Sequence, residues 1–377
     1  MNIGIDISSI VYGRGVSRYT SNLVRVLMGQ TNLTISLYGS SFRQHQVLNS
    51  FAQNFKSQIQ NSRQSSNLKF KIQKFPPSVL EKLWQFGLNP MSKLLPNLDV
   101  FHSWDWMQPP DKNLPLVSTI HDLAILKFPQ TAHPKILKMH RRAWKILKER
   151  EAQIIAVSQS TKNDLIDLLD WNPHKIHVIY EALPQETIKI SKNLSETKYE
   201  QIKLKLNLNK PYLFFVGTRE PRKNLEKLIK AWQPLSKDYD LLIAGESGWD
   251  KSNKITGSQP IFLGHVCDEE LVVLYSEAET FCYPSLYEGF GLPILEAFYH
   301  GTPVITSNVS SMPEVAGNAA ELVDPLSVKS IRKGIEKILG ENQKDQQKRL
   351  QRMIIRLQQF SWEKATREIV EVYKKTY

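Results

Sequence analysis

Short apolar runs recur along the first half of the chain and alternate with longer stretches of helical periodicity. The first run, residues 3–7, leads into a loop with two glycines and then a helical pattern through Leu23, Val26 and Leu27, which predicts a β-loop-α unit. Further strands are predicted at residues 33–38, 98–103, 115–120, 153–158 and 176–180. Strands that alternate with helices in this way are typical of a parallel sheet covered on both faces.

A second series of strands and helices follows a polar stretch, residues 184–210, which we interpret as a linker. Strands are predicted at residues 211–217, 240–245, 261–264, 279–283, 304–306 and 321–323, and helices at 223–236, 268–278 and from about 293. Residues 326–377 carry Lys, Gln and Glu at helical spacing and predict a helical tail. Both halves are therefore interpreted as doubly wound α/β domains.

Hydrophobic residues make up 41% of the chain and charged residues 23%, which is typical of an ordinary globular protein. A length of 377 residues exceeds one small domain and favours two domains. Two cysteines, Cys267 and Cys282, are too few for a disulfide framework, which favours a reducing, cytoplasmic location. The first residues lack the pattern of a signal peptide, and no apolar run approaches ~18 residues. We therefore expect neither secretion by a cleaved signal nor a membrane-spanning segment.

The positive charge is concentrated in the first half of the chain. Residues 1–180 hold 22 Lys and Arg against 11 Asp and Glu, a net charge of +11, whereas residues 181–377 hold 27 against 26, a net charge of +1. This asymmetry predicts that the first half faces an anionic partner, with phospholipid, nucleic acid or a phosphorylated acceptor as candidates.

The strongest motif is a glycine-containing turn between a predicted strand and a predicted helix. Gly289 and Gly291 lie in the turn, and Pro293 lies where the helix begins, where its missing N–H has no cost. The backbone N–H groups of Phe290, Gly291 and Leu292 would point out of the helix start and bind an anion.

Two acidic residues flank this turn. Glu288 precedes it, and Glu296 lies one turn into the helix. Each carboxylate could accept a hydrogen bond from a hydroxyl of a sugar or a ribose. The alternative is purely structural: a helix with a favourable acidic first turn, and a loop that needs glycine for its φ angles.

Residues 288–296, EGFGLPILE, resemble the Glu-x7-Glu pattern of retaining glycosyltransferases of family 4. Other similar segments are IHDL (120–123), IIAVSQSTKNDL (154–165), VGTREPRKNL (216–225), IFLGHV (261–266) and FSWEKA (360–365). The chain looks most similar to bacterial mannosyltransferase-like members that build cell-surface polysaccharides. The resemblance implies an α/β fold of the GT-B type, with two Rossmann-like domains facing each other across a cleft, and C-terminal helices.

The resemblance also implies a domain organisation for the chain. The expected parts are an acceptor-binding domain at 1–183, a linker region at 184–210, a nucleotide-sugar-binding domain at 211–360, and a C-terminal helix at 361–377 that packs back on the first domain.

Roles of individual residues follow from the same resemblance. Glu296 resembles the acid that accepts both ribose hydroxyls of the nucleotide, and Glu288 resembles the acid near the transferred sugar. The backbone from Gly289 to Leu292 would bind sugar hydroxyls and the distal phosphate, and Val266 would offer its backbone to the base.

Fixed cations are needed beside a leaving diphosphate, whose negative charge grows as the glycosidic bond breaks. Arg222 and Lys223 follow the first strand of the second domain, and Lys223 matches the family's lysine. Many family members place an arginine where this chain has Thr218, so either Arg219 or Arg222 takes its place. The alternative, a solvated helix start, would set positive charge against the helix dipole.

In the first half, Gly13 and Gly15 lie between the first strand and the first helix, where the backbone can approach a phosphate. A plain tight turn would give the same pattern, and the resemblance to the family's donor-facing loop favours binding. Arg18 is expected on the donor or acceptor side, or simply in solvent.

His121 follows the predicted strand 115–120, at the edge where open α/β sheets bind ligands. It matches the family's histidine that contacts the transferred sugar, although a lone histidine is more often structural. Asp122 is expected to orient the imidazole or to bind the acceptor. Residues Ser158 to Lys162 resemble the family's segment after the next cleft-facing strand, and a helix N-cap by Ser158 or Ser160 explains them equally well.

Residues 133–150 predict a basic amphipathic helix, with Trp144 near the edge of its apolar side. Such a helix can lie on an anionic membrane, or it can pack on a core with its basic side in solvent. Residues 75–96, with Trp84, Phe86 and Met91, suggest a further apolar contact with membrane or acceptor.

The sequence thus predicts a retaining hexosyltransferase that moves a hexose, with mannose favoured, from a nucleotide diphosphate sugar to a lipid-linked or saccharide acceptor. The alternatives are a synthase of the same fold with a soluble acceptor, and a non-catalytic binder of nucleotide sugar or nucleic acid. The expected donors are GDP-mannose or a UDP-hexose. No Asp-x-Asp motif lies near the inferred phosphate site, so metal-independent catalysis without a cofactor is expected. Nucleic acid is not an expected partner, and the expected location is cytoplasmic, peripheral to the inner face of the plasma membrane.

Overall fold

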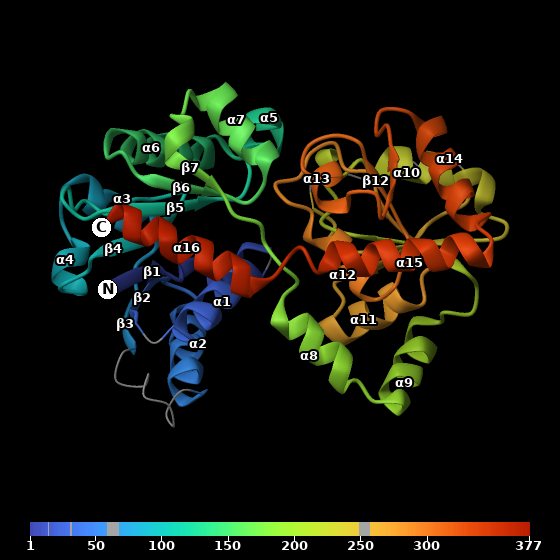
Figure 1. The fold of residues 1–377 in the computed structure, drawn as a ribbon, viewed down its shortest axis with the longest axis horizontal. Coiled ribbons are helices and arrows are strands. Elements are labelled where there is room, and N and C mark those ends of the chain that lie inside the picture. The colour runs from blue at the N-terminus through green and yellow to red at the C-terminus, as the bar shows by residue number, and fades with distance from the viewer. Residues whose placement is uncertain (14, 31, 59–67, 249–256) are drawn as a thin grey trace. The chain divides into compact units, whose positions relative to one another are not determined.

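The computed structural model describes all residues except 14, 31, 59–67 and 249–256. It divides into two compact units (Figure 1). The first contains Met1–Leu126, Ala132–Glu181 and Trp362–Tyr377, and the second contains Lys127–Thr131 and Ala182–Ser361. Each has its own parallel sheet, as the alternation of strands and helices predicts.

The sheet of the first unit has the strand order β3-β2-β1-β4-β5-β6-β7, and every pair is parallel. Its strands are β1 (Asn2–Asp6), β2 (Thr34–Ser40), β3 (Leu68–Gln73), β4 (Val100–Trp104), β5 (Leu116–Ile120), β6 (Gln153–Ala156) and β7 (Ile176–Val178). The first six follow the order of the Rossmann fold, in which the chain reverses direction across the sheet between β1 and β4.

The helices of the first unit cover this sheet. They are α1 (Gly15–Met28), α2 (His45–Gln58), α3 (Pro77–Gln85), α4 (Met91–Leu94), α5 (Ala124–Lys127, whose last residue falls in the second unit), α6 (Pro134–Glu149), α7 (Gln159–Leu169) and α16 (Trp362–Thr376). Short 3₁₀ turns lie at η1 (Ser8–Tyr12), η3 (Pro129–Thr131, in the second unit) and η4 (Pro173–Lys175). The last helix, α16, packs against α1, β5 and β6 (Figure 1).

The sheet of the second unit has the order β10-β9-β8-β11-β12-β13, again parallel throughout. Its strands are β8 (Tyr212–Val216), β9 (Asp240–Ala244), β10 (Ile261–Gly264), β11 (Thr280–Tyr283), β12 (Val304–Ser307) and β13 (Glu321–Val323). Renumbered from β8, this is also the Rossmann order, with the reversal between β8 and β11.

The second unit carries eight α-helices within the described residues. They are α8 (Gln185–Asn193), α9 (Glu196–Leu206), α10 (Leu225–Trp232), α11 (Asp268–Ser276), α12 (Leu292–Tyr299), α13 (Met312–Ala316), α14 (Val328–Leu339) and α15 (Gln343–Leu357), with 3₁₀ turns η5 (Pro221–Lys223) and η6 (Gln233–Leu235). The helical tail predicted from the sequence is therefore present as α14, α15 and α16.

Two features differ from the sequence-based expectation. Strand β3 was not predicted, because its residues alternate between lysines and apolar side chains at the sheet edge, so it lacks a continuous apolar run. The stretch predicted as a linker, residues 184–210, forms α8 and α9 within the second unit. Both helices pack on α11, which explains why a polar stretch is nevertheless ordered.

No helix in the described ranges is long and apolar enough to span a membrane.

Candidate active site

Most of the predicted site residues follow strands that flank the reversal point of each sheet. Chain segments leave β1 and β4, or β8 and β11, in opposite directions, which opens a crevice at the carboxyl edge where ligands bind in this class of fold. In the second unit the EPRKN segment, residues 220–224, follows β8, and the glycine turn follows β11.

Glu288 is the centre of a buried ion-pair cluster in the second unit. One carboxylate oxygen accepts a hydrogen bond from Nζ of Lys223 at 2.7 Å, and the other accepts one from Arg222 at 2.8 Å. Arg222 also pairs with Glu220 at 2.8 Å. Glu288 and Lys223 are 6% and 7% exposed, so this charge cluster is shielded from water.

The cluster is held in place by its own backbone and by Tyr283. The phenol oxygen of Tyr283, the last residue of β11, accepts a hydrogen bond from Nζ of Lys223 at 2.8 Å. The carbonyl of Arg222 accepts a hydrogen bond from the backbone N–H of Leu286 at 2.7 Å. Asn224 has a positive φ of 58° and donates its side-chain amide to the carbonyls of Pro284 and Pro325.

The charge balance favours an ionised carboxylate. Although burial alone would raise the pKa of Glu288, the neighbouring Arg222 and Lys223 lower it from 4.5 to about 2. The cluster therefore holds a permanent carboxylate between two cations at the reversal point of the sheet.

One of the two glycines of the turn, Gly291, has the positive φ for which glycine is needed. Gly291 precedes α12 with a φ of 103°, a value that side chains rarely tolerate, and the proline at the second helical position starts the helix. Ser310 and Ser311, which follow β12, stabilise the turn. Both hydroxyls donate hydrogen bonds to the carbonyl of Glu288, and the Ser311 hydroxyl also donates to the carbonyl of Phe290. The helix start is thus fixed without a ligand.

The other residues of the second unit that were predicted to bind the donor lie around these elements. Glu296 is 5% exposed on α12 and accepts a hydrogen bond from the Tyr275 hydroxyl at 3.1 Å. The guanidinium of Arg219 lies 4.6 Å from the ring centre of Phe262, whereas Arg222 belongs to the Glu288 cluster. Val266 is buried and lies in the short segment that joins β10 to α11. Thr218, Gly289, Phe290 and Leu292 lie in or beside the same loops.

In the first unit, His121 is held by a carboxylate that the sequence analysis did not single out. Nδ1 of His121, just after β5, donates to Glu181 at 3.1 Å. Its ring lies edge-on to Tyr19 at 4.8 Å and stacked on Trp104 at 6.0 Å. Nε2 is buried and has no hydrogen-bond partner among the described residues. A ligand that offers a hydroxyl would satisfy this atom.

The surroundings favour a protonated imidazole. Burial would lower the pKa of His121, but the hydrogen bond and charge of Glu181, with contributions from Asp105 and Asp122, raise it above its usual value. The Asp122 carboxylate instead accepts a hydrogen bond from the backbone N–H of Ala124, the first residue of α5. Glu181 therefore takes the orienting role that the sequence analysis offered to Asp122.

The glycine loop of the first unit lies at the start of α1. Gly13 has a φ of 62°, and neither Gly13 nor Gly15 has another group within 4 Å of where a Cβ would stand, so the backbone here is open to close approach. Arg18 lies on the first turn of α1, and residue 14 of the motif lies outside the described residues. Ser158 is the N-cap of α7, as one of the two alternatives predicted.

Two expectations for the apolar segments need correction. Trp144 of α6 is 2% exposed and belongs to the core of the first unit with Trp84 and Met91, so these side chains cannot enter a membrane. Phe86 alone of the three singled out in residues 75–96 is exposed, at 78%. The sequence pattern did not distinguish these positions because all of them are large and apolar.

Residues missed by sequence reasoning share one signal. Glu181 follows β7, Tyr283 ends β11, and Asp6 ends β1, where burial raises its pKa to about 6. All three lie at the carboxyl ends of predicted strands, the same edge that directed attention to His121.

Comparison with known proteins agrees with this geometry. The chain matches the family of glycosyl transferases group 1 over residues 197–373 and glycosyltransferase family 4 over residues 13–184. It is 34% identical to O-antigen chain mannosyltransferase B of Escherichia coli over 273 residues, which is 68% of this chain and 70% of that one. It is 30% identical to O-antigen chain mannosyltransferase RfbU of Salmonella typhimurium, with 58% of this chain and 60% of that one covered.

Solved structures show the same fold along the whole chain. A glycosyltransferase from Rickettsia africae has a TM-score of 0.70 at 18% identity and covers 100% of this chain and 98% of its own. Anabaena Alr3699/HepE, in complex with UDP-glucose, has a TM-score of 0.67 at 16% identity and covers 100% of both chains.

The two Rossmann-like units and these relatives define a glycosyltransferase of the GT-B fold class. The chain belongs to the family 4 glycosyltransferases, and its second half matches the glycosyl transferases group 1. The predictions of this family, of the fold and of a retaining hexosyltransferase related to enzymes of cell-surface polysaccharide synthesis are confirmed.

Proposed function

We propose that this enzyme transfers mannose from GDP-mannose to a hydroxyl of a lipid-linked or oligosaccharide acceptor. Mannose is supported by the 34% identity to an O-antigen chain mannosyltransferase, and a nucleotide sugar by the UDP-glucose bound to the structurally similar Alr3699/HepE. A UDP-hexose is the alternative donor.

The observation that carries this proposal is the cluster of Lys223, Arg222 and Glu288. Two cations beside the N-terminus of α12 give a diphosphate three sources of positive potential. In the free enzyme Glu288 balances these cations. In the proposed donor complex the diphosphate shares them, which leaves the Glu288 carboxylate able to accept a sugar hydroxyl.

The chemistry that follows needs no protein nucleophile. The bond between the anomeric carbon and the phosphate oxygen breaks, the acceptor oxygen bonds to the same face of that carbon, and the departing phosphate oxygen takes the acceptor's proton. Lys223 and Arg222 stabilise the negative charge on the leaving diphosphate. Because these two cations supply that stabilisation, the proposal includes catalysis without a metal ion.

For the place of action we propose the cytoplasmic side of the plasma membrane, with the enzyme peripheral to it. The net charge of +11 on residues 1–180 supports attraction to anionic phospholipid.

A donor screen tests the proposal. Purified enzyme with excess EDTA is incubated with GDP-mannose, UDP-glucose and other nucleotide sugars, with and without a mannoside acceptor, and released nucleotide is measured. We expect release from GDP-mannose that depends on acceptor and persists in EDTA. Glu296→Ala should lose at least about 100-fold in kcat/KM, while the exposed control Glu269→Gln stays unchanged. Release from no nucleotide sugar would contradict the proposal.

A further inference from the structure

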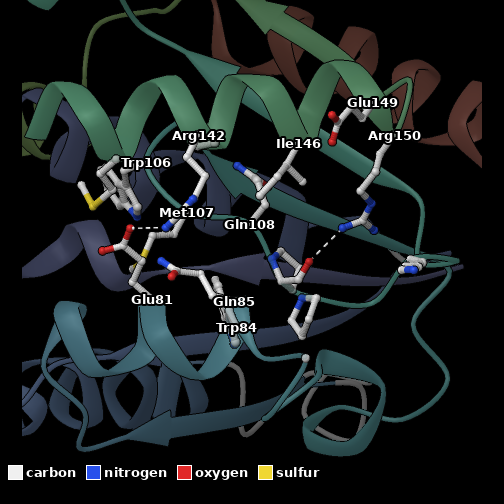
Figure 2. A pocket seen from close by; sticks show the side chains of 16 residues that line it. Glu81, Trp84, Gln85, Trp106, Met107, Gln108, Arg142, Ile146, Glu149 and Arg150 are labelled. Carbon is white, nitrogen blue, oxygen red and sulfur yellow. Dashed lines mark hydrogen bonds and ion pairs between the residues drawn. The ribbon is translucent and has the colours of Figure 1, made fainter.

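A groove between α3 and α6 of the first unit has no part in the donor chemistry. It encloses about 630 Å³, and its floor is the segment that follows β4 (Figure 2). The wall is mainly apolar and includes Trp84, Trp106, Met107, Pro109, Met139 and Ile146.

Three polar side chains of the groove, Gln108, Arg142 and Arg150, already have partners within the protein. Arg142 pairs with Glu81 across it at 3.2 Å, and Arg150 donates to the backbone carbonyl of Pro109 at 2.9 Å (Figure 2). The amide of Gln108 bonds Ser103 and the backbone of Trp104. The interior of the groove is therefore better suited to contact an apolar ligand than to form hydrogen bonds with a sugar.

The rim combines exposed apolar side chains with a basic surface. Phe86 and Leu88 flank groove residue Gly87 and are 78% and 54% exposed. Lys135, Lys138, Arg141 and Lys145 are exposed on α6, the helix that forms one wall of the groove. Apolar side chains next to a row of cations are typical of proteins that lie on anionic lipid.

One end of the groove lies close to His121. Trp106 packs against Trp104 at 6.5 Å between ring centres, and Trp104 stacks on His121 at 6.0 Å. The buried Trp104 thus separates the groove from His121.

We propose that the groove between α3 and α6 binds the hydrocarbon chain of an anionic membrane lipid, and that the basic face of α6 binds its headgroup. That the natural occupant is the lipid carrier of the acceptor rests on the proposed function. The binding of a hydrocarbon chain in the groove does not depend on that function.

Fluorescence quenching by brominated lipid tests the site. Vesicles of phosphatidylcholine and phosphatidylglycerol, with bromine on the phosphatidylglycerol chains, quench a tryptophan only where a chain touches it. We expect quenching in the full-length enzyme that falls at least twofold in Trp106→Phe. Ile146→Lys should abolish it, since a lysine inside the groove disfavours an apolar chain while adding attraction to the vesicle.

Ile136→Lys is the matched control, because it makes the same change on the same helix at a 44% exposed position that does not line the groove. Quenching should persist in this variant, and circular dichroism establishes that both fold. Unchanged quenching in Ile146→Lys would overturn the proposal. So would an equal loss of quenching in both variants, or sedimentation of the enzyme with vesicles without any quenching. Either of these two results would favour adsorption to the membrane surface.

Failure of the two proposals can be told apart. Transfer to a water-soluble mannoside should be unaffected by Ile146→Lys. If quenching fails while this transfer proceeds, the groove is wrong and the proposed function stands. If quenching behaves as expected but no nucleotide sugar is consumed, the lipid site stands and the proposed function is wrong.

Discussion

Glu288 holds Arg222 and Lys223 through opposite oxygens of one carboxylate. Glu288→Gln would leave two partly or fully buried cations without that charge, and we expect a loss of about 3–5 kcal/mol in the free energy of unfolding. Urea denaturation measures the loss. Because a diphosphate would supply the missing charge, GDP should raise the melting temperature of the variant more than that of the native enzyme. An equal or smaller rise in the variant would contradict the exchange of partners.

The same carboxylate makes stability depend on acid. Its pKa is about 2 in the folded chain against an ordinary 4.5, so its contribution to stability is present above about 4.5 and is lost as pH falls toward 2. Glu288→Gln should remove this part of the acid dependence, measured as unfolding free energy between pH 5 and 3. A variant whose profile runs parallel to that of the native enzyme would argue against the assignment.

His121 has a raised pKa because Glu181 accepts a hydrogen bond from its ring. Glu181→Gln should lower that pKa, measured by NMR titration of the imidazole, while His140, which pairs with Asp105, serves as the internal control. The pair should contribute stability fully below the ordinary value of about 6.5 and lose it as pH rises through the raised pKa. An unchanged titration of His121 in the variant would show that Glu181 does not control it.

These residues also show where sequence reasoning ends at this scale. The glutamates and cations of the second unit are close in sequence to glycine and proline signals, so their location could be predicted. Glu181 lies 60 residues beyond His121, and its approach depends on how β5, β6 and β7 align in the sheet. Periodicity predicts that such strands exist but does not fix which side chains meet at their ends.

At the scale of elements, the start of α12 depends on one backbone conformation. Gly291→Ala should cost about 1–3 kcal/mol of unfolding free energy and weaken donor binding, because φ is 103° and a Cβ would approach Ile294 at 3.3 Å. For stability, Gly15→Ala at the start of α1 is the control and should be tolerated, since its φ is not positive and the space is open. Thermal unfolding compares the two variants, and equal losses of stability would contradict the account. GDP titration of the Gly291 variant against the native enzyme measures the loss of donor binding.

Helices and strands with continuous apolar runs could be predicted from the sequence. Those stabilised mainly by packing on neighbouring elements could not. The central strands of both sheets are buried on two faces and therefore stand out in the sequence. Strand β3 and helices α8 and α9 are partly exposed and become ordered by packing on neighbours, which local pattern does not reveal. Helix α6 has the predicted amphipathic pattern, yet the pattern alone could not tell that Trp144 packs inward.

At the scale of the whole molecule, the positive charge of the first half is the property that should govern association with membranes. Replacing Lys138, Arg141 and Lys145 by Gln should weaken binding to phosphatidylglycerol vesicles by roughly 100-fold at low salt and flatten its salt dependence. The same change at Lys329, Lys333 and Lys337 on α14 of the second unit is the matched control. Vesicle co-sedimentation measures both, and equal losses would mean that net charge alone, not its placement, decides binding.

The most direct test of the central claim is the affinity for GDP-mannose when the cation cluster is altered. Isothermal titration in EDTA compares the native enzyme with Lys223→Gln and with Lys230→Gln, an exposed lysine on the adjacent helix α10. We predict that the native enzyme binds, that Lys230→Gln binds equally well, and that Lys223→Gln loses at least about 10-fold in affinity. Equal binding by all three proteins would contradict the assignment of the diphosphate to this cluster.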